Sequence, residues 1–156
     1  MLFDKSWIYP IFALFLAAVA LLLIPKAQYK KFFLYGLLFG GLGDAVIVTL
    51  FSKLLPILRY KHTGAFGVDD FSIWTPIGWA LAFAIFLYLL PRRWAFMVPY
   101  LMTFVGLSFM IAIILANFGL LDYLKPGYRF VGIIIFTLWY AIAAYLYLRT
   151  ERIELR

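Results

Sequence analysis

The chain has 156 residues, of which 67% are hydrophobic and only 13% are charged, and its formal net charge is +7. Typical soluble domains contain about 45–50% apolar and about 25% charged residues, so this composition excludes an ordinary soluble fold and favours a membrane protein. The chain has no cysteine and one histidine, which excludes disulfides, a thiolate nucleophile and a multi-histidine metal site. We therefore expect no metal and no cofactor.

Five apolar runs follow one another along the chain, and each is near the roughly 20 residues that a helix needs to cross a bilayer. They predict spans at Trp7–Ile24, Phe32–Phe51, Ile73–Leu90, Trp94–Phe118 and Phe130–Leu148. The runs are apolar on all sides and longer than the roughly ten-residue alternating strands of a membrane barrel. Helices also satisfy their own backbone polar groups, as lipid requires. The sequence thus predicts an all-α transmembrane bundle of five spans, forming one domain over residues 1–156.

Basic residues in the predicted loops set the expected orientation, because cytoplasmic loops carry an excess of lysine and arginine. The two sides hold eight and six of them: Lys26, Lys30, Lys31, Arg92, Arg93, Arg149, Arg152 and Arg156 against Lys5, Lys53, Arg59, Lys61, Lys125 and Arg129. We expect the N-terminus outside and the C-terminus in the cytoplasm, in a bacterial inner membrane. Such residues anchor helix ends to anionic headgroups, so membrane lipids are expected partners and nucleic acid is not.

The longest predicted loop, residues 52–72, collects charged groups of both signs. Its candidate ligand-binding residues are Arg59, Lys61, His62, Asp69 and Asp70. Cations beside carboxylates could bind a headgroup phosphate or a divalent ion, but adjacent aspartates on a strand point to opposite faces, so no metal site is predicted. The alternative is an amphipathic segment that lies on the outer headgroups.

Asp44 stands out because it lies about twelve residues into the second run, roughly 18 Å along the helix. A carboxylate at that depth costs on the order of 2.5–3.5 kcal/mol, so it must face the bundle interior, be protonated or have a partner. Helical spacing places it on one face with Gly36, Gly40 and Gly43, which would let a neighbouring helix approach closely. Its candidate partners within the membrane are Thr49, Thr103, Ser108, Asn117, Thr137 and Tyr140.

Two interpretations of Asp44 stay open at this point. In the first, its carboxyl makes a hydrogen bond that fixes helix packing, with Gly36, Gly40 and Gly43 as packing residues. In the second, it is a working group, because intramembrane carboxylates are frequently functional. It would then be a ligand contact, a proton relay or an acid catalyst.

The order of these landmarks resembles that of a family of small, uncharacterised multi-span membrane proteins of spore-forming Firmicutes. The likeness runs from Tyr29-Lys30-Lys31-Phe32-Phe33 to Gly43-Asp44, then through Trp74-Thr75-Pro76 with Trp79, and on to Leu121-Asp122-Tyr123 and Gly127-Tyr128. It covers most of the chain and implies a bacterial source, but no mechanism. A shorter stretch, from Tyr35 to Asp44, is similar to a segment of the MreD rod-shape proteins.

The functional expectation follows from what the chain lacks. With one histidine, no cysteine and a single embedded acid, we expect a non-enzymatic membrane protein that binds a lipid, another membrane protein or a second copy of itself. One alternative is an intramembrane enzyme on a lipid or isoprenoid substrate, with Asp44 as general acid and candidate catalytic residue. The other is a small proton-coupled transporter in which Asp44 carries the proton.

Overall fold

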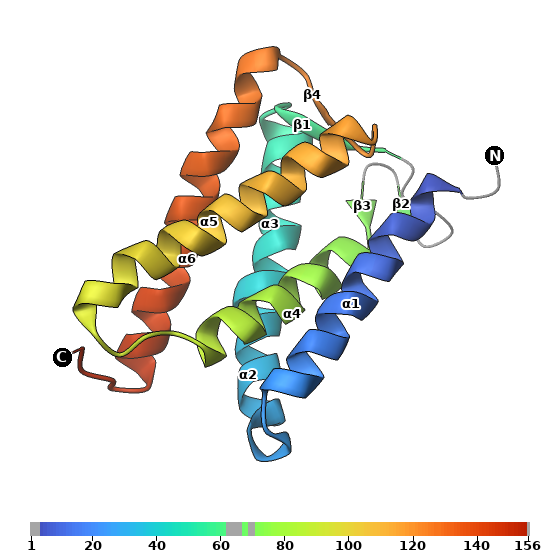
Figure 1. The fold of residues 1–156 in the computed structure, drawn as a ribbon. Helices are drawn as coiled ribbons and strands as arrows, with labels where there is room; N and C mark the ends of the chain where they lie inside the picture. The colour runs from blue at the N-terminus through green and yellow to red at the C-terminus, as the bar shows by residue number, and fades with distance from the viewer. Residues whose placement is uncertain (1–3, 62–66, 69–70, 156) are drawn as a thin grey trace.

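The computed structural model describes residues 4–61, 67–68 and 71–155, and it is a bundle of helices with a few short strands at one end (Figure 1). The α-helices are α1 (Ile8–Leu23), α2 (Tyr29–Gly36), α3 (Gly43–Thr49), α4 (Trp74–Tyr88), α5 (Trp94–Asn117) and α6 (Val131–Thr150). The strands are β1 (Leu58–Tyr60), β2 (Gly67–Val68), β3 (Phe71–Ser72) and β4 (Leu121–Tyr123).

Four helical segments are long and apolar enough to cross a bilayer, namely Lys5–Leu23, Lys26–Leu54, Trp94–Asn117 and Gly127–Thr150. Large apolar side chains are exposed on their outer surfaces, for example Leu22, which is 85% exposed, and Leu14, which is 64% exposed. A soluble protein rarely presents so much contiguous apolar surface, whereas a bilayer solvates it. The predicted transmembrane helical bundle is confirmed.

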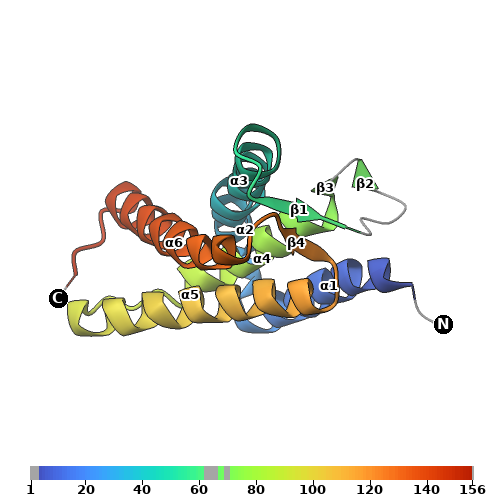
Figure 2. The same ribbon diagram turned by 90° about the horizontal axis from the view of Figure 1, so that it is seen from above.

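The predicted count of five spans is not exact, because α4 is shorter than the other helices. Its 15 residues reach about 22 Å, less than the roughly 30 Å of the hydrocarbon core. Five consecutive residues of α4, from Phe83 to Leu87, are nevertheless buried on all sides. Other helices surround α4, which lies in the middle of the bundle when seen from above (Figure 2). Because protein rather than lipid surrounds this helix, the thickness of the bilayer does not fix its length.

Side-chain contacts connect α1 with the end of α5 at one end of the bundle, and α2 with the end of α6 at the other. At the N-terminal end, where α1 begins, Lys5 Nζ donates a hydrogen bond to the Phe118 carbonyl at 3.0 Å. At the C-terminal end, where α6 finishes, Lys31 forms an ion pair with Glu151. Tyr35 donates a second hydrogen bond to Glu151, at 2.8 Å. These two donors hold the pKa of Glu151 below its usual range.

The second helical segment is longer than predicted and is not regular. It runs from Lys26 to Leu54, and two stretches within it, Leu37–Leu42 and Leu50–Leu54, are π-helical. A π turn closes its hydrogen bonds over five residues instead of four, which changes the direction of every side chain that follows. The first stretch ends directly before α3, so it helps to determine where Asp44 points.

Part of the chain between this segment and α4 is paired as strands. Strand β1 pairs antiparallel with β4, so that Leu58 lies opposite Tyr123 and Tyr60 opposite Leu121. A second short pair joins β2 to β3. The Tyr9 hydroxyl on α1 donates to the carbonyls of Lys61 and Leu120, at 3.0 and 2.8 Å. The β1–β4 pair thus closes the N-terminal end of the bundle.

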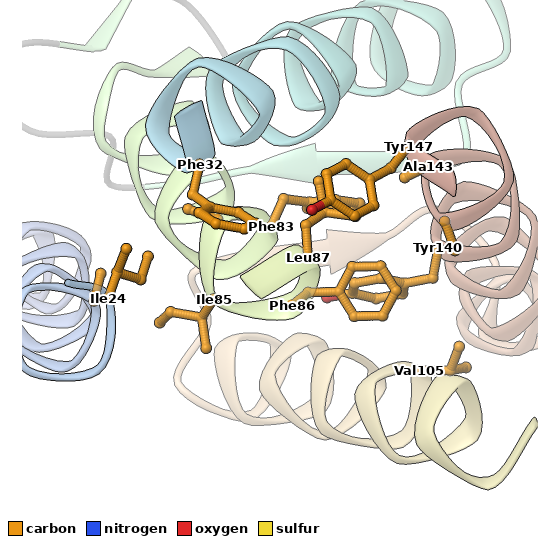
Figure 3. Close-up of a cluster of buried hydrophobic side chains, with 13 residues drawn as sticks. Ile24, Phe32, Phe83, Ile85, Phe86, Leu87, Val105, Tyr140, Ala143 and Tyr147 are labelled. Atoms are coloured by element: carbon orange, nitrogen blue, oxygen red, sulfur yellow. The ribbon is translucent and has the colours of Figure 1, made fainter. Parts of the chain in front are cut away.

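The densest part of the core lies toward the other end, where α4 meets α2, α5 and α6 (Figure 3). Tyr140 of α6 stacks on Phe83 of α4 with ring centroids 4.6 Å apart, and it meets Phe86 edge-on at 4.7 Å. Phe32 and Tyr147 close the cluster from α2 and α6. The side chains around α4 are therefore closely packed in this half of the bundle.

Candidate functional site

Asp44 lies in the first turn of α3, directly after the π-helical stretch, and it is only 2% exposed. The stretch is supported from outside, because Trp139 on α6 donates its indole N–H to the Phe39 carbonyl at 2.7 Å. A π turn leaves backbone groups that need such external partners, and it frequently marks a functional position. The structure therefore places Asp44 in the bundle interior, at a locally irregular point of the helix.

The glycines before Asp44 do not share one face, in contrast to the predicted arrangement. A Cβ added to Gly36 would lie 2.2 Å from the Ala80 carbonyl oxygen, and one added to Gly40 would lie 2.1 Å from that of Trp79. Both glycines therefore pack directly against the backbone of α4. Gly43 packs instead against α6, since its added Cβ would lie 2.6 Å from Trp139 Nε1. The π-helical stretch between Gly36 and Gly43 supplies the reason, because it rotates Gly43 out of the α-helical register.

The carboxyl of Asp44 is incompletely satisfied. Its Oδ2 is buried and has no hydrogen-bond partner among the described residues. The Thr75 hydroxyl, near the start of α4, approaches this carboxyl. That hydroxyl also donates to the Ser72 carbonyl at 3.0 Å, so its single proton is shared between two acceptors. A buried polar atom without a partner is rare in folded proteins and indicates a functional position.

None of the partners proposed from the sequence has a hydrogen bond to Asp44 among the described residues, and Asn117 is exposed at the end of α5. Thr49, Thr103 and Thr137 each donate to a carbonyl of their own helix. Ser108 and Tyr140 bond to each other, with 2.9 Å between their oxygens. Sequence reasoning did not find Thr75, because its position in the first turn of a helix gives it an ordinary local role.

Asp44 lines a cavity of about 490 Å³ in the N-terminal half of the bundle. Helices α1, α3, α4, α5 and α6 form its walls, and β1 and β4 contribute Tyr60 and Tyr123. Most of the cavity surface is apolar, and the polar groups besides Asp44 are the hydroxyls and indole N–H groups of tyrosine, serine, threonine and tryptophan side chains. Burial raises the pKa of Tyr60, with a further contribution from the nearby Asp44 carboxyl, so the Tyr60 hydroxyl is a neutral donor.

The charged cluster predicted in the long loop is only partly described, and its described members do not line the cavity. Lys61 forms an ion pair with Asp122, and both side chains are nearly half exposed. Arg59 lies opposite Asp122 in the β1–β4 register and is exposed. His62, Asp69 and Asp70 lie outside the described residues. Sequence reasoning missed Asp122, because the pairing of β1 with β4 joins residues far apart in the chain.

The fold and the cavity define an integral membrane protein with a largely apolar internal site around one buried carboxyl. Within the described residues, no group of three or more histidine, cysteine, aspartate or glutamate side chains could hold a metal ion. No known protein-family model, curated protein or solved structure matches this chain.

Proposed function

We propose that this protein is a non-enzymatic component of a bacterial cell membrane that binds an apolar, chain-like lipid in the cavity beside Asp44. The observation that carries the proposal is a cavity of about 490 Å³, almost wholly apolar, with one partly unsatisfied carboxyl in its wall. Ligand pockets commonly enclose about 300–1,000 Å³ and combine apolar walls with a few polar groups that fix orientation. The composition and size of the cavity both fit this description.

The surrounding membrane is the natural source of such a ligand. Apolar cavities of this kind are poorly filled by water, which needs two to four polar partners. Three residues that line the cavity, Phe15, Leu107 and Ile114, are also 44–61% exposed on the surfaces of α1 and α5. The cavity therefore reaches the lipid-facing surface, and a hydrocarbon chain can enter sideways from the bilayer.

Asp44 would receive the polar end of this lipid. Its Oδ2 is buried without a partner among the described residues and can accept a hydrogen bond from a hydroxyl or an amine. A hydrogen bond to a buried acceptor stabilises a complex most when water cannot reach that acceptor. The ligand class is thus a single-chain or isoprenoid-like amphiphile whose small head carries a hydrogen-bond donor.

Binding is favoured over catalysis by the state of the other polar groups. An enzyme needs a second convergent group beside its acid. Ser108 and Tyr140 bond to each other, and Thr75 donates to a backbone carbonyl, so these three hydroxyls are engaged. The Tyr60 hydroxyl near Asp44 is a neutral donor that can hold a ligand by a hydrogen bond. If Asp44 were a general acid or carried a transported proton, Asp44→Asn would abolish function. Lipid binding should survive the same substitution.

Filling the cavity should displace the lipid. Ala82 on α4 lines the cavity and is half-buried, whereas Ala141 on α6 is exposed and does not line it. We expect Ala82→Trp to lose most of the lipid that co-purifies with the protein, and Ala141→Trp to retain it. Native mass spectrometry of both variants, extracted from the same membranes, measures the difference. Equal lipid retention by the two variants would contradict the proposal, and Ala82→Leu offers a smaller obstruction if the tryptophan variant does not fold.

We further propose that the N-terminal end faces outward and the C-terminal end faces the cytoplasm. Six basic residues of the described chain belong to the first end and seven to the second, which follows the positive-inside rule. The chain lacks cysteine, so single cysteines can be introduced at Lys30 and Lys125, both exposed and at opposite ends. In intact cells, a membrane-impermeant thiol reagent should label the cysteine at position 125 and spare the one at position 30. Labelling in the reverse order, or of both, would refute this orientation.

A further inference from the structure

A second, smaller cavity of about 180 Å³ lies at the C-terminal end, where the α1–α2 turn meets the ends of α4 and α6. We call it the basic pocket. Gln28, Tyr88, Arg92 and Tyr147 contribute its polar groups, and the rest of its wall is apolar. We propose that the basic pocket binds the phosphate group of an anionic membrane lipid.

The polar groups of the basic pocket form a set of unused donors. Arg92 offers five N–H groups in a planar fork, Gln28 offers an amide NH₂, and Tyr88 offers a hydroxyl. Within the part of the chain that the structure describes, none of these three side chains has a hydrogen bond or an ion pair. A guanidinium beside other donors matches the oxygens of a phosphate, because charge-assisted bonds to such a fork can be bidentate.

The carboxylate of Glu151 does not compete for this site. Glu151 lies close enough to influence Tyr147, which lines the basic pocket. It is already held by the ion pair with Lys31 and the hydrogen bond from Tyr35. The Arg92 guanidinium is therefore left to an external anion.

A lipid fits the basic pocket better than a free phosphate does. Phe32, Leu87 and Ile153 give it apolar walls, which an inorganic anion would not use. It lies where helices end, and further exposed cations are close in the chain to its lining residues, namely Lys26, Lys30, Arg93, Arg149 and Arg152. Basic pockets between helices on the cytoplasmic side of membrane proteins commonly bind anionic headgroups.

The test compares two neighbouring arginines. Arg92 lines the basic pocket, whereas the adjacent Arg93, which is also exposed, does not. The protein is purified in neutral detergent, and its thermal midpoint is followed as phosphatidylglycerol is added to the micelles. We expect the midpoint of the unmodified protein and of Arg93→Gln to rise at the same lipid fraction. Arg92→Gln should need about tenfold more lipid for the same rise, because it loses a charge-assisted contact.

Three further measurements show whether the bound anion is a lipid headgroup or free phosphate, and whether Arg92 binds it. Phosphatidylcholine with the same acyl chains should raise the midpoint much less than phosphatidylglycerol. Inorganic phosphate at millimolar concentration should not reproduce the rise, and a full rise with it would overturn the assignment to a lipid. Equal responses of Arg92→Gln and Arg93→Gln would overturn the site itself. If Arg92→Gln does not fold, Arg92→Lys keeps the charge but loses the fork, and it should still need more lipid than Arg93→Lys does.

Discussion

Gly40→Ala should destabilise the bundle strongly, while Gly106→Ala should leave it unchanged or slightly more stable. A Cβ at position 40 would lie 2.1 Å from the Trp79 carbonyl oxygen and 2.8 Å from the Ala80 backbone nitrogen. These are backbone atoms of the buried central helix α4, so they cannot move aside as a flexible side chain can. The two helices would have to separate, and we expect a loss on the order of 3 kcal/mol in the free energy of unfolding.

Gly106 provides the matched control for this substitution. It lies within α5, is exposed, and has no atom within 4 Å of an added Cβ. Replacing such a glycine by alanine removes backbone freedom from the unfolded chain and can add about 0.4–1 kcal/mol of stability. Thermal unfolding of both variants in the same detergent gives the comparison. Similar midpoints for the two variants would contradict the close approach of α3 and its preceding π-helical stretch to α4.

Asp44→Leu should raise the stability of the lipid-free protein and lower its affinity for the lipid. The substitution removes a buried carboxyl oxygen that has no partner among the described residues, and such an atom costs about 1–3 kcal/mol. It leaves the Thr75 hydroxyl satisfied, because this group already donates to Ser72. The lipid head would lose its acceptor, so we expect roughly a tenfold weaker affinity. A gain in stability together with a loss of binding is typical of a functional residue.

Asp44→Asn separates the remaining roles of this residue. Asparagine keeps the size of aspartate and one carbonyl acceptor, so lipid binding should stay within a few-fold of the unmodified protein. It cannot carry a proton in the pH range of cells, so a role as general acid or proton carrier would be lost completely. Thermal unfolding, lipid retention and complementation of a deletion strain should be measured on the Asn and Leu variants together. Normal folding and lipid retention of Asp44→Asn with failed complementation would refute the binding proposal and favour proton chemistry.

The membrane class and most helix positions were predictable from the sequence, because apolar length and composition are set by the bilayer. The predicted runs Trp94–Phe118 and Phe130–Leu148 fall close to α5 and α6. The burial of Asp44 was predictable for the same reason, since lipid does not tolerate an exposed carboxylate. These inferences depend on one residue or one run at a time, and they need no knowledge of distant contacts.

Features that depend on two distant segments could not be predicted. In the β1–β4 pair, Arg59 lies opposite Asp122. Each strand has only three residues, too few to show an alternating pattern in the sequence. The π-helical stretch Leu37–Leu42 depends on Trp139, which donates to its Phe39 carbonyl from α6. The sequence contains both residues but gives no sign that they meet. The assumption of a regular helix therefore predicted that Gly43 packs on the same helix as Gly36 and Gly40, whereas it packs on α6.

The content of the cavity tests the central proposal most directly. The measurement is the density beside Asp44 in a structure of the unmodified protein determined in a lipid nanodisc made from bacterial membrane lipids. The proposal predicts one elongated density within the cavity of about 490 Å³, with its polar end within hydrogen-bonding distance of Asp44 Oδ2. A cavity filled by ordered water that leads to the membrane surface, or one closed by the lining side chains, would contradict it.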